Sequence, residues 1–257
     1  MRLMKRILSA AAVLALSASL LVGCSSGTAS SVPVSASSAA ESTVSSVEET
    51  SSSAVDENEA AAAQLLNDLT GSYQELWPVI LADEYKQTWL DDCTALVGED
   101  NAEAAFEKLS SMVTGDVYGE DAVKAYANGG AYFCGFTNSL ATLTFDGETS
   151  TISGTDKDGN VLFSHTYHYI GMEPVRGLYE FESDDADSGE FTYFFLAPDT
   201  SAETYHIEFR YGSDAEALSQ YDAGEYAYWV ASGISTDCDQ TMIDNCIELF
   251  CTENLAG

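Results

Sequence analysis

The residue with the clearest capacity for chemistry is His206, in a stretch that alternates polar and apolar side chains from Thr204 to Tyr211. Residues two apart in a strand point to the same face, so His206 and Glu208 share one face. Imidazole and carboxylate groups are both zinc ligands, whereas the hydroxyl of Thr204 is a poor one. Lone histidines on strands are more often structural or solvated. The pattern by itself therefore leaves a metal role and a plain solvated strand face both open.

Two other histidines, His165 and His168, lie on a strand that we expect to neighbour the one carrying His206. Their spacing is odd, so their side chains point to opposite faces. At most one of them can join His206 in a cluster. Nothing in their spacing favours such a cluster.

Five cysteines follow Cys24, and none of them is in a Cys-x-x-Cys spacing, so a thiolate metal site or a thioredoxin-like motif is not indicated. An odd number leaves at least one cysteine free or paired between molecules. We expect buried apolar cysteines plus one or two disulfides of undetermined connectivity. The five are Cys93, Cys134, Cys238, Cys246 and Cys251.

Enzyme signatures are absent from the sequence. It contains no Gly-x-Ser-x-Gly elbow, P-loop, His-Glu-x-x-His or dinucleotide fingerprint. No pair of carboxylates stands out for glycoside hydrolysis. The segment 156–160 is better explained as a hairpin turn than as a calcium loop, because the later bidentate Glu is missing. We therefore expect a protein that is not an enzyme.

The charge balance narrows the choice of partners. The formal net charge is -33, and three of the nine basic residues (Arg2, Lys5 and Arg6) lie near the N-terminus. Nucleic acid is excluded as a partner, because phosphate binding needs a basic face. Cations and cationic partners suit this field best. Solubility alone is the simpler explanation of the charge.

The elements that must position these residues are readable from the periodicity of apolar side chains. Helical spacing occurs over residues 57–69, 82–93 and 102–112, and again over 242–250. Between them the period changes to two, with Asp-Gly turns at Asp146-Gly147 and Asp158-Gly159. The predicted strands are 140–145, 149–154, 161–170, 177–182, 190–196 and 204–211. Short antiparallel strands at this spacing favour a barrel or a sandwich.

The N-terminus predicts export. A basic start, an apolar stretch and Leu21-Val22-Gly23-Cys24 resemble the bacterial lipoprotein signal, in which the cysteine is lipidated (palmitate among its acyl chains). An ordinary secretory signal is the alternative. We expect a signal peptide over 1–23, a lipidated Cys24 with a disordered Ser-rich tether over 24–58, and one domain over 59–257. The protein would then be extracytoplasmic and anchored to the cell membrane by lipid alone.

Several strings, in order and spacing, resemble the ZinT (YodA) family of metal-binding proteins, which also forms the C-terminal part of AdcA-type zinc lipoproteins. The match covers most of residues 64–250. The strings are Asp68-Leu-Thr-Gly-Ser-Tyr-Gln74 with Pro78 and Trp89, Phe145-Asp146-Gly147, Tyr167-His-Tyr-Ile-Gly171, Asp185-Ala-Asp-Ser-Gly-Glu-Phe-Thr-Tyr193, Ala202-Glu-Thr-Tyr-His-Ile207 and Glu216-Ala-Leu218.

The resemblance implies a mainly β fold, a calycin or lipocalin-like antiparallel barrel with N-terminal helices and a C-terminal helix. The family binds zinc through three histidines, of which His206 retains one; Thr204 replaces another, and Asp199 is nearest the third. The implied site has His206 and Asp199, with Glu208 as a third ligand, at the barrel mouth with the imidazole aimed into the lumen. The implied function is the capture or buffering of a divalent metal ion, with Zn²⁺ as the cargo and a metal ABC transporter as a further partner. The alternative is a barrel that has lost its metal and binds a small ligand or a partner protein at the cell surface.

Overall fold

The computed structural model describes residues 48–126, 131–198 and 201–256 of the 257-residue chain. The predicted signal peptide, Cys24 and Asp199 lie outside these ranges. Within them, no helix combines the length and the apolar character needed to cross a bilayer.

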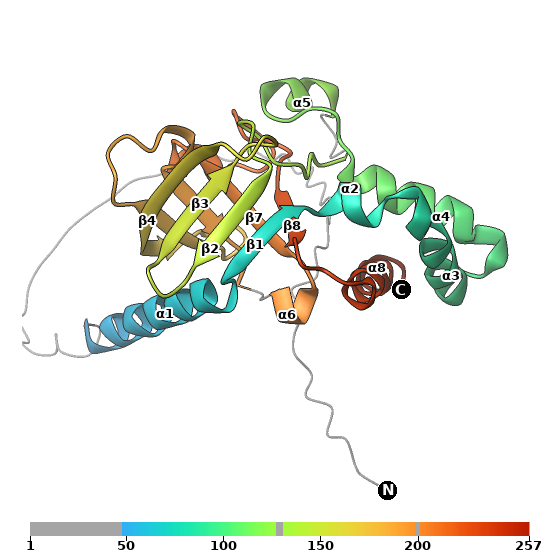
Figure 1. The fold of residues 1–257 in the computed structure, drawn as a ribbon, viewed down its shortest axis with the longest axis horizontal. Helices are drawn as coiled ribbons and strands as arrows, with labels where there is room; N and C mark the ends of the chain where they lie inside the picture. The colour runs from blue at the N-terminus through green and yellow to red at the C-terminus, as the bar shows by residue number, and fades with distance from the viewer. Residues whose placement is uncertain (1–47, 127–130, 199–200, 257) are drawn as a thin grey trace, which may run out of the picture. The chain divides into compact units, whose positions relative to one another are not determined.

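The centre of the domain is a closed antiparallel barrel whose eight strands follow one another in chain order (Figure 1). This confirms the predicted fold class, and six of the strands coincide with predicted ones. The strands are β1 (Gly71–Glu75), β2 (Thr142–Asp146), β3 (Thr151–Thr155), β4 (Val161–Met172), β5 (Tyr179–Ser183), β6 (Tyr193–Leu196), β7 (Ile207–Gly212) and β8 (Ala231–Ser235). Two strands, β1 and β8, were not predicted; they pair with each other and close the barrel.

Ring contacts identify which strand face lines the lumen. The ring of Phe194 on β6 lies 5.8 Å from that of Phe163 and 5.4 Å from that of Tyr167. Both of these belong to β4, and β5 lies between β4 and β6, so these rings must meet inside the barrel. Phe194 pairs with Tyr211 across the β6–β7 ladder, so Tyr211 also faces inward. The lumen is therefore filled with aromatic side chains.

Helix α1 (Glu48–Asp68) packs its apolar face on this core. The packed residues are Ala62, Leu65 and Leu66, together with Leu69 directly after the end of the helix. The β2–β3 hairpin touches the end of α1, where the backbone N–H of Gly147 donates to the hydroxyl of Thr70 at 3.1 Å. The predicted helix over 57–69 is confirmed, but α1 begins at Glu48, within the predicted tether.

A second apolar core lies between the barrel and a group of helices. These helices are α2 (Leu76–Ile80), α3 (Lys86–Val97), α4 (Glu99–Val113) and α8 (Gln240–Leu255). α3, α4 and α8 match the predicted helices, although α3 begins later than expected and α8 is longer. The centre of this layer contains Trp89, Ile234 and Ile247, none of which is exposed. Three short helices, α5 (Glu120–Ala125), α6 (Ser201–Thr204) and α7 (Ala215–Leu218), lie in the connections.

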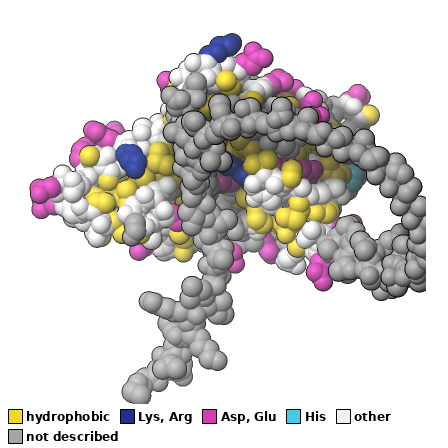
Figure 2. Space-filling view, turned by 180° about the vertical axis from the view of Figure 1, so that it is seen from behind, with side chains coloured by type: hydrophobic (Ala, Val, Ile, Leu, Met, Phe, Trp, Pro, Cys, Tyr) yellow, Lys and Arg dark blue, Asp and Glu magenta, His cyan; other side chains and the backbone are white. Residues whose placement is uncertain are grey.

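The surface reflects the charge balance. Figure 2 shows acidic side chains at many places on the visible face and basic side chains at few. Among the described residues, the ion pairs between lysine and acidic side chains are exposed, as between Lys86 and Glu103 at 2.9 Å. Such pairs contribute little to stability.

In the structure, none of the predicted disulfides is formed, and all five cysteines of the described domain are free thiols. The prediction that most of them are buried is confirmed, because only Cys238 is partly exposed.

Candidate metal centre

His206 lies at the entrance to β7, directly after a sharp turn of the chain. α6 ends at Thr204, and Tyr205 adopts a left-handed backbone conformation with φ of 64°. A non-glycine residue in this region costs about 1–3 kcal/mol, and such residues cluster at functional sites. The turn brings the chain into β7 with His206 and Glu208 on the same side of the strand.

The ring of His206 is fixed by its own backbone. Its Nδ1 lies 2.7 Å from the carbonyl oxygen of Thr204. A carbonyl can only accept, so Nδ1 carries a proton and donates it. The Thr204 hydroxyl in turn donates to the carbonyl of His206 at 2.6 Å. In the neutral ring the lone pair is therefore on Nε2. This is the arrangement in which a backbone carbonyl orients a metal-binding histidine.

Nε2 faces a carboxylate. It lies 3.9 Å from Oε1 of Glu208, with 19% of the His206 side chain and 35% of the Glu208 side chain exposed. The separation is too long for a direct hydrogen bond. The two groups therefore form a half-buried pair with a gap between their facing atoms.

The site is on the outer surface of the barrel, so the prediction of a ring aimed into the lumen at the barrel mouth is wrong. Tyr211 and Phe209 face inward, and strand alternation puts Glu208 and Arg210 outside. Helix α8, which packs on this outer side, brings the Cys246 thiol to 3.9 Å from Nδ1 of His206.

The neighbours of His206 control its protonation. Burial by itself would lower its pKa, but the interactions with Cys246 and then with the carboxylate of Glu208 outweigh burial and raise the pKa well above the usual value. Burial would raise the pKa of Glu208, but its interaction with His206, helped by the charge of Arg176, lowers it. The pair therefore favours an imidazolium beside a carboxylate, and a metal ion must displace a proton from His206.

The other predicted ligands do not join this pair among the described residues. Asp199 lies outside them. His165 and His168 are on β4, which is separated from β7 by β5 and β6, so the expectation of neighbouring strands is wrong. Each has a carboxylate of its own: His165 Nδ1 is 2.7 Å from Asp185, and His168 Nδ1 is 2.7 Å from Asp184.

The donor set near His206 fits only part of a zinc site. In the described ranges, no group of three or more His, Cys, Asp or Glu side chains is placed to hold a metal ion. Two ligand atoms, His206 Nε2 and Glu208 Oε1, face each other. The residues that sequence reasoning missed are Cys246 and Arg176. The apolar face predicted for the C-terminal helix includes Cys246, but which strand it covers could not be read from that pattern.

No protein-family model and no curated protein matches the chain. Among solved structures, by contrast, similar proteins are found. The Zn(II)-bound ZinT-like domain of AdcA from Streptococcus pneumoniae is 16% identical, with a TM-score of 0.46 over 72% of this chain and 89% of that domain. Zn(II)-bound AdcA from the same organism is 17% identical with a TM-score of 0.41, and the match spans 34% of its length.

Proposed function

We propose that the chain is a lipid-anchored extracytoplasmic protein that binds a divalent metal ion, with Zn²⁺ as the ion that its ligand types suit best. The observation that carries the proposal is the fixed ring of His206, whose Nε2 lies 3.9 Å from Glu208 Oε1. The predicted signal and Cys24 support the location. The role is binding, for capture or buffering, rather than catalysis.

The separation of the two atoms suits a shared ion. Zinc binds imidazole nitrogen and carboxylate oxygen at about 2.0–2.2 Å, so two ligands of one tetrahedral ion lie roughly 3.3–3.5 Å apart. Closing the observed gap needs a movement of about half an ångström, which rotation of the Glu208 side chain supplies. Water would complete the coordination, and Asp199 stays a predicted protein ligand beside His206 and Glu208.

A small ligand inside the barrel is the weaker alternative. Such a ligand needs a cavity, whereas the lumen contains stacked rings such as Phe163 and Phe191, with centroids 4.0 Å apart. A metal transporter in the same membrane is the partner that a capture role would serve.

Isothermal titration calorimetry with Zn²⁺ at about pH 8 tests the proposal, because a higher pH favours loss of the proton from His206. We expect saturable binding by the wild type and at least a tenfold loss of affinity in His206→Ala and Glu208→Gln. The matched control is His168→Ala, which removes an imidazole that also faces a carboxylate and should leave affinity unchanged.

Two results would overturn the proposal: no saturable heat in the wild type, or an affinity that His206→Ala leaves intact. Circular dichroism on each variant checks that the domain is folded. Asp199→Asn, measured in the same way, determines whether this residue is a ligand.

A further inference from the structure

Helices α3 and α8, which pack on each other in the helical group beside the barrel, place two thiols close together. Cys93 on α3 and Cys251 on α8 have their sulfur atoms 3.9 Å apart, and neither residue is exposed. They are separated by 158 positions in the sequence. A disulfide bond is about 2.05 Å long, so the two sulfurs must approach each other by roughly 1.9 Å to form one.

The other cysteines have different surroundings. The thiol of Cys246 faces the ring of His206, and that of Cys134 lies 3.9 Å from the carbonyl oxygen of Tyr132. Cys238 is partly exposed. Of the five cysteines in the described domain, Cys93 and Cys251 are therefore the pair that the fold itself aligns.

We infer that Cys93 and Cys251 form an intramolecular disulfide when the chain folds outside the cell, joining α3 to α8. Each thiol loses one hydrogen, the two sulfurs form the S–S bond, and two electrons pass to a thiol-oxidising disulfide donor, which is reduced to two thiols. The inference rests on the extracytoplasmic location in the proposed function, because disulfides persist in that compartment.

Once the helices are packed, burial makes the sulfurs of Cys93 and Cys251 unreactive. Burial raises the pKa of both thiols, and the thiolate is the reactive species. The bond should therefore form while the helices are still assembling, before the sulfurs are buried. A chain that folds reduced should keep both thiols unreactive.

The bond would link α3 and α8 at a place where acidic side chains of the two helices repel each other. Burial and then the nearby charges of Glu248 and Asp244 on α8 raise the pKa of Asp92 on α3. One of its carboxylate oxygens is buried without a hydrogen bond. A covalent link next to this acidic contact holds α8 in place, and α8 also carries the Cys246 thiol that touches His206.

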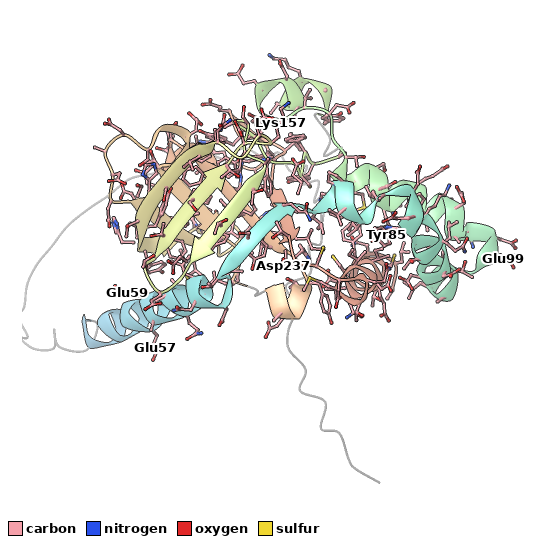
Figure 3. All side chains as sticks on the ribbon, in the orientation of Figure 1. Glu57, Glu59, Tyr85, Glu99, Lys157 and Asp237 are labelled. Atoms are coloured by element: carbon pink, nitrogen blue, oxygen red, sulfur yellow. The ribbon has the colours of Figure 1, made fainter. Side chains whose placement is uncertain are left out.

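Peptide mapping tests the pairing. The full chain with its own leader is produced in bacteria, quenched with N-ethylmaleimide, denatured and cut after glutamate without reduction. Cys93 is then alone in residues 85–99 and Cys251 alone in 249–253. Figure 3 labels Tyr85 and Glu99, the ends of the first peptide, which covers α3. We expect these two peptides linked in the membrane fraction, and the linked species lost on reduction.

Two variants make the assignment specific. Cys251→Ser should abolish the linked species and leave Cys93 alkylated, whereas the matched control Cys238→Ser should retain it. Recovery of both peptides as alkylated thiols from the wild-type membrane fraction would overturn the inference.

A second experiment, refolding of the purified chain, tests the disulfide pairing independently of the proposed location and metal binding. The purified chain is reduced, unfolded and refolded with reduced and oxidised glutathione, and the same linked peptides are sought. Their absence contradicts the pairing whatever the location of the chain. If the chain is found only in the cytosol, the proposed location outside the cell is wrong. The refolding result then shows by itself whether Cys93 and Cys251 pair. Zinc calorimetry tests the metal site, and its outcome changes neither the location of the chain nor the disulfide pairing.

Discussion

At the scale of the residue, His206 and Glu208 determine each other's protonation. The raised pKa of His206 means that the folded state favours its charged form. This contribution to stability is complete below the unfolded pKa of about 6.5 and is lost as pH rises through the folded pKa. The lowered pKa of Glu208 gives a contribution that is present above about 4.3 and is lost as pH falls through the folded value.

Glu208→Gln should therefore lower the free energy of unfolding most between about pH 5 and pH 6.5, where both contributions are present. The loss should be no more than about 1 kcal/mol, because 35% of the Glu208 side chain is exposed to screening solvent. Urea unfolding at a series of pH values measures it.

The control for that measurement is Glu203→Gln, which removes an equal charge from an exposed position close by in the sequence. It should show no maximum in this range. A difference between Glu208→Gln and wild type that is flat from pH 4 to pH 9 would refute the coupling.

The pairing of His206 with Glu208 was accessible from sequence, because alternation alone puts both on one strand face. Whether that face points into the lumen or outward could not be read from the sequence. The same alternation describes a ring inside the lumen and a ring under a helix. Only the packing of α8, with Cys246 next to the ring, decided between them.

At the scale of the element, the hairpins followed their turn signals closely. Asp146-Gly147 joins β2 to β3, and Asp158-Gly159 lies between β3 and β4. Asp156 closes the second turn by accepting the backbone N–H groups of Asp158 and Asn160 through Oδ1. These contacts are local, so sequence patterns report them well.

The close contact of the first hairpin with α1 predicts a packing defect. A Cβ atom added to Gly147 would lie 2.4 Å from Cα of Asn67, a backbone atom that cannot move alone. Gly147→Ala should therefore lower the free energy of unfolding by about 1–3 kcal/mol, measured by urea denaturation.

Gly171→Ala is the matched control, since its added Cβ would meet only a side-chain oxygen of Glu180 at 3.7 Å. Its effect should stay within about 0.5 kcal/mol. Equal effects of the two substitutions would show that α1 does not press on the hairpin as described.

β1 and β8 were missed because their sequences carry little strand signal. β1 contains Gly71 and Ser72, and β8 contains Ser232 and Gly233. Such residues have low strand propensity, and pairing decides their conformation. Each is held between two neighbours when the barrel closes.

At the scale of the whole molecule, the net charge of -33 acts against compactness through self-repulsion. Salt reduces this repulsion, because the Debye length falls from about 30 Å at about 0.01 M to about 3 Å at about 1 M. NaCl over this range should therefore raise the free energy of unfolding by at least about 1 kcal/mol, or about 2–4 °C in Tm. Thermal melts followed by circular dichroism measure the change.

Choline chloride at equal ionic strength separates screening from specific cation binding. The two salts should stabilise alike if screening is the cause. A Tm that stays constant or falls with NaCl would show that repulsion does not limit the stability of this domain.

The order of the main helices and hairpins, the antiparallel β class, the excess of negative charge and the pairing of His206 with Glu208 were all predictable from sequence. These features depend on local periodicity and turn chemistry, which neighbouring residues carry. Three features became known only from the packing of the folded chain: the rings that fill the lumen, the position of His206 on the outer surface, and the contact between Cys93 and Cys251. Those outcomes depend on contacts between segments far apart in the chain, and no local pattern encodes which distant surface packs on which face.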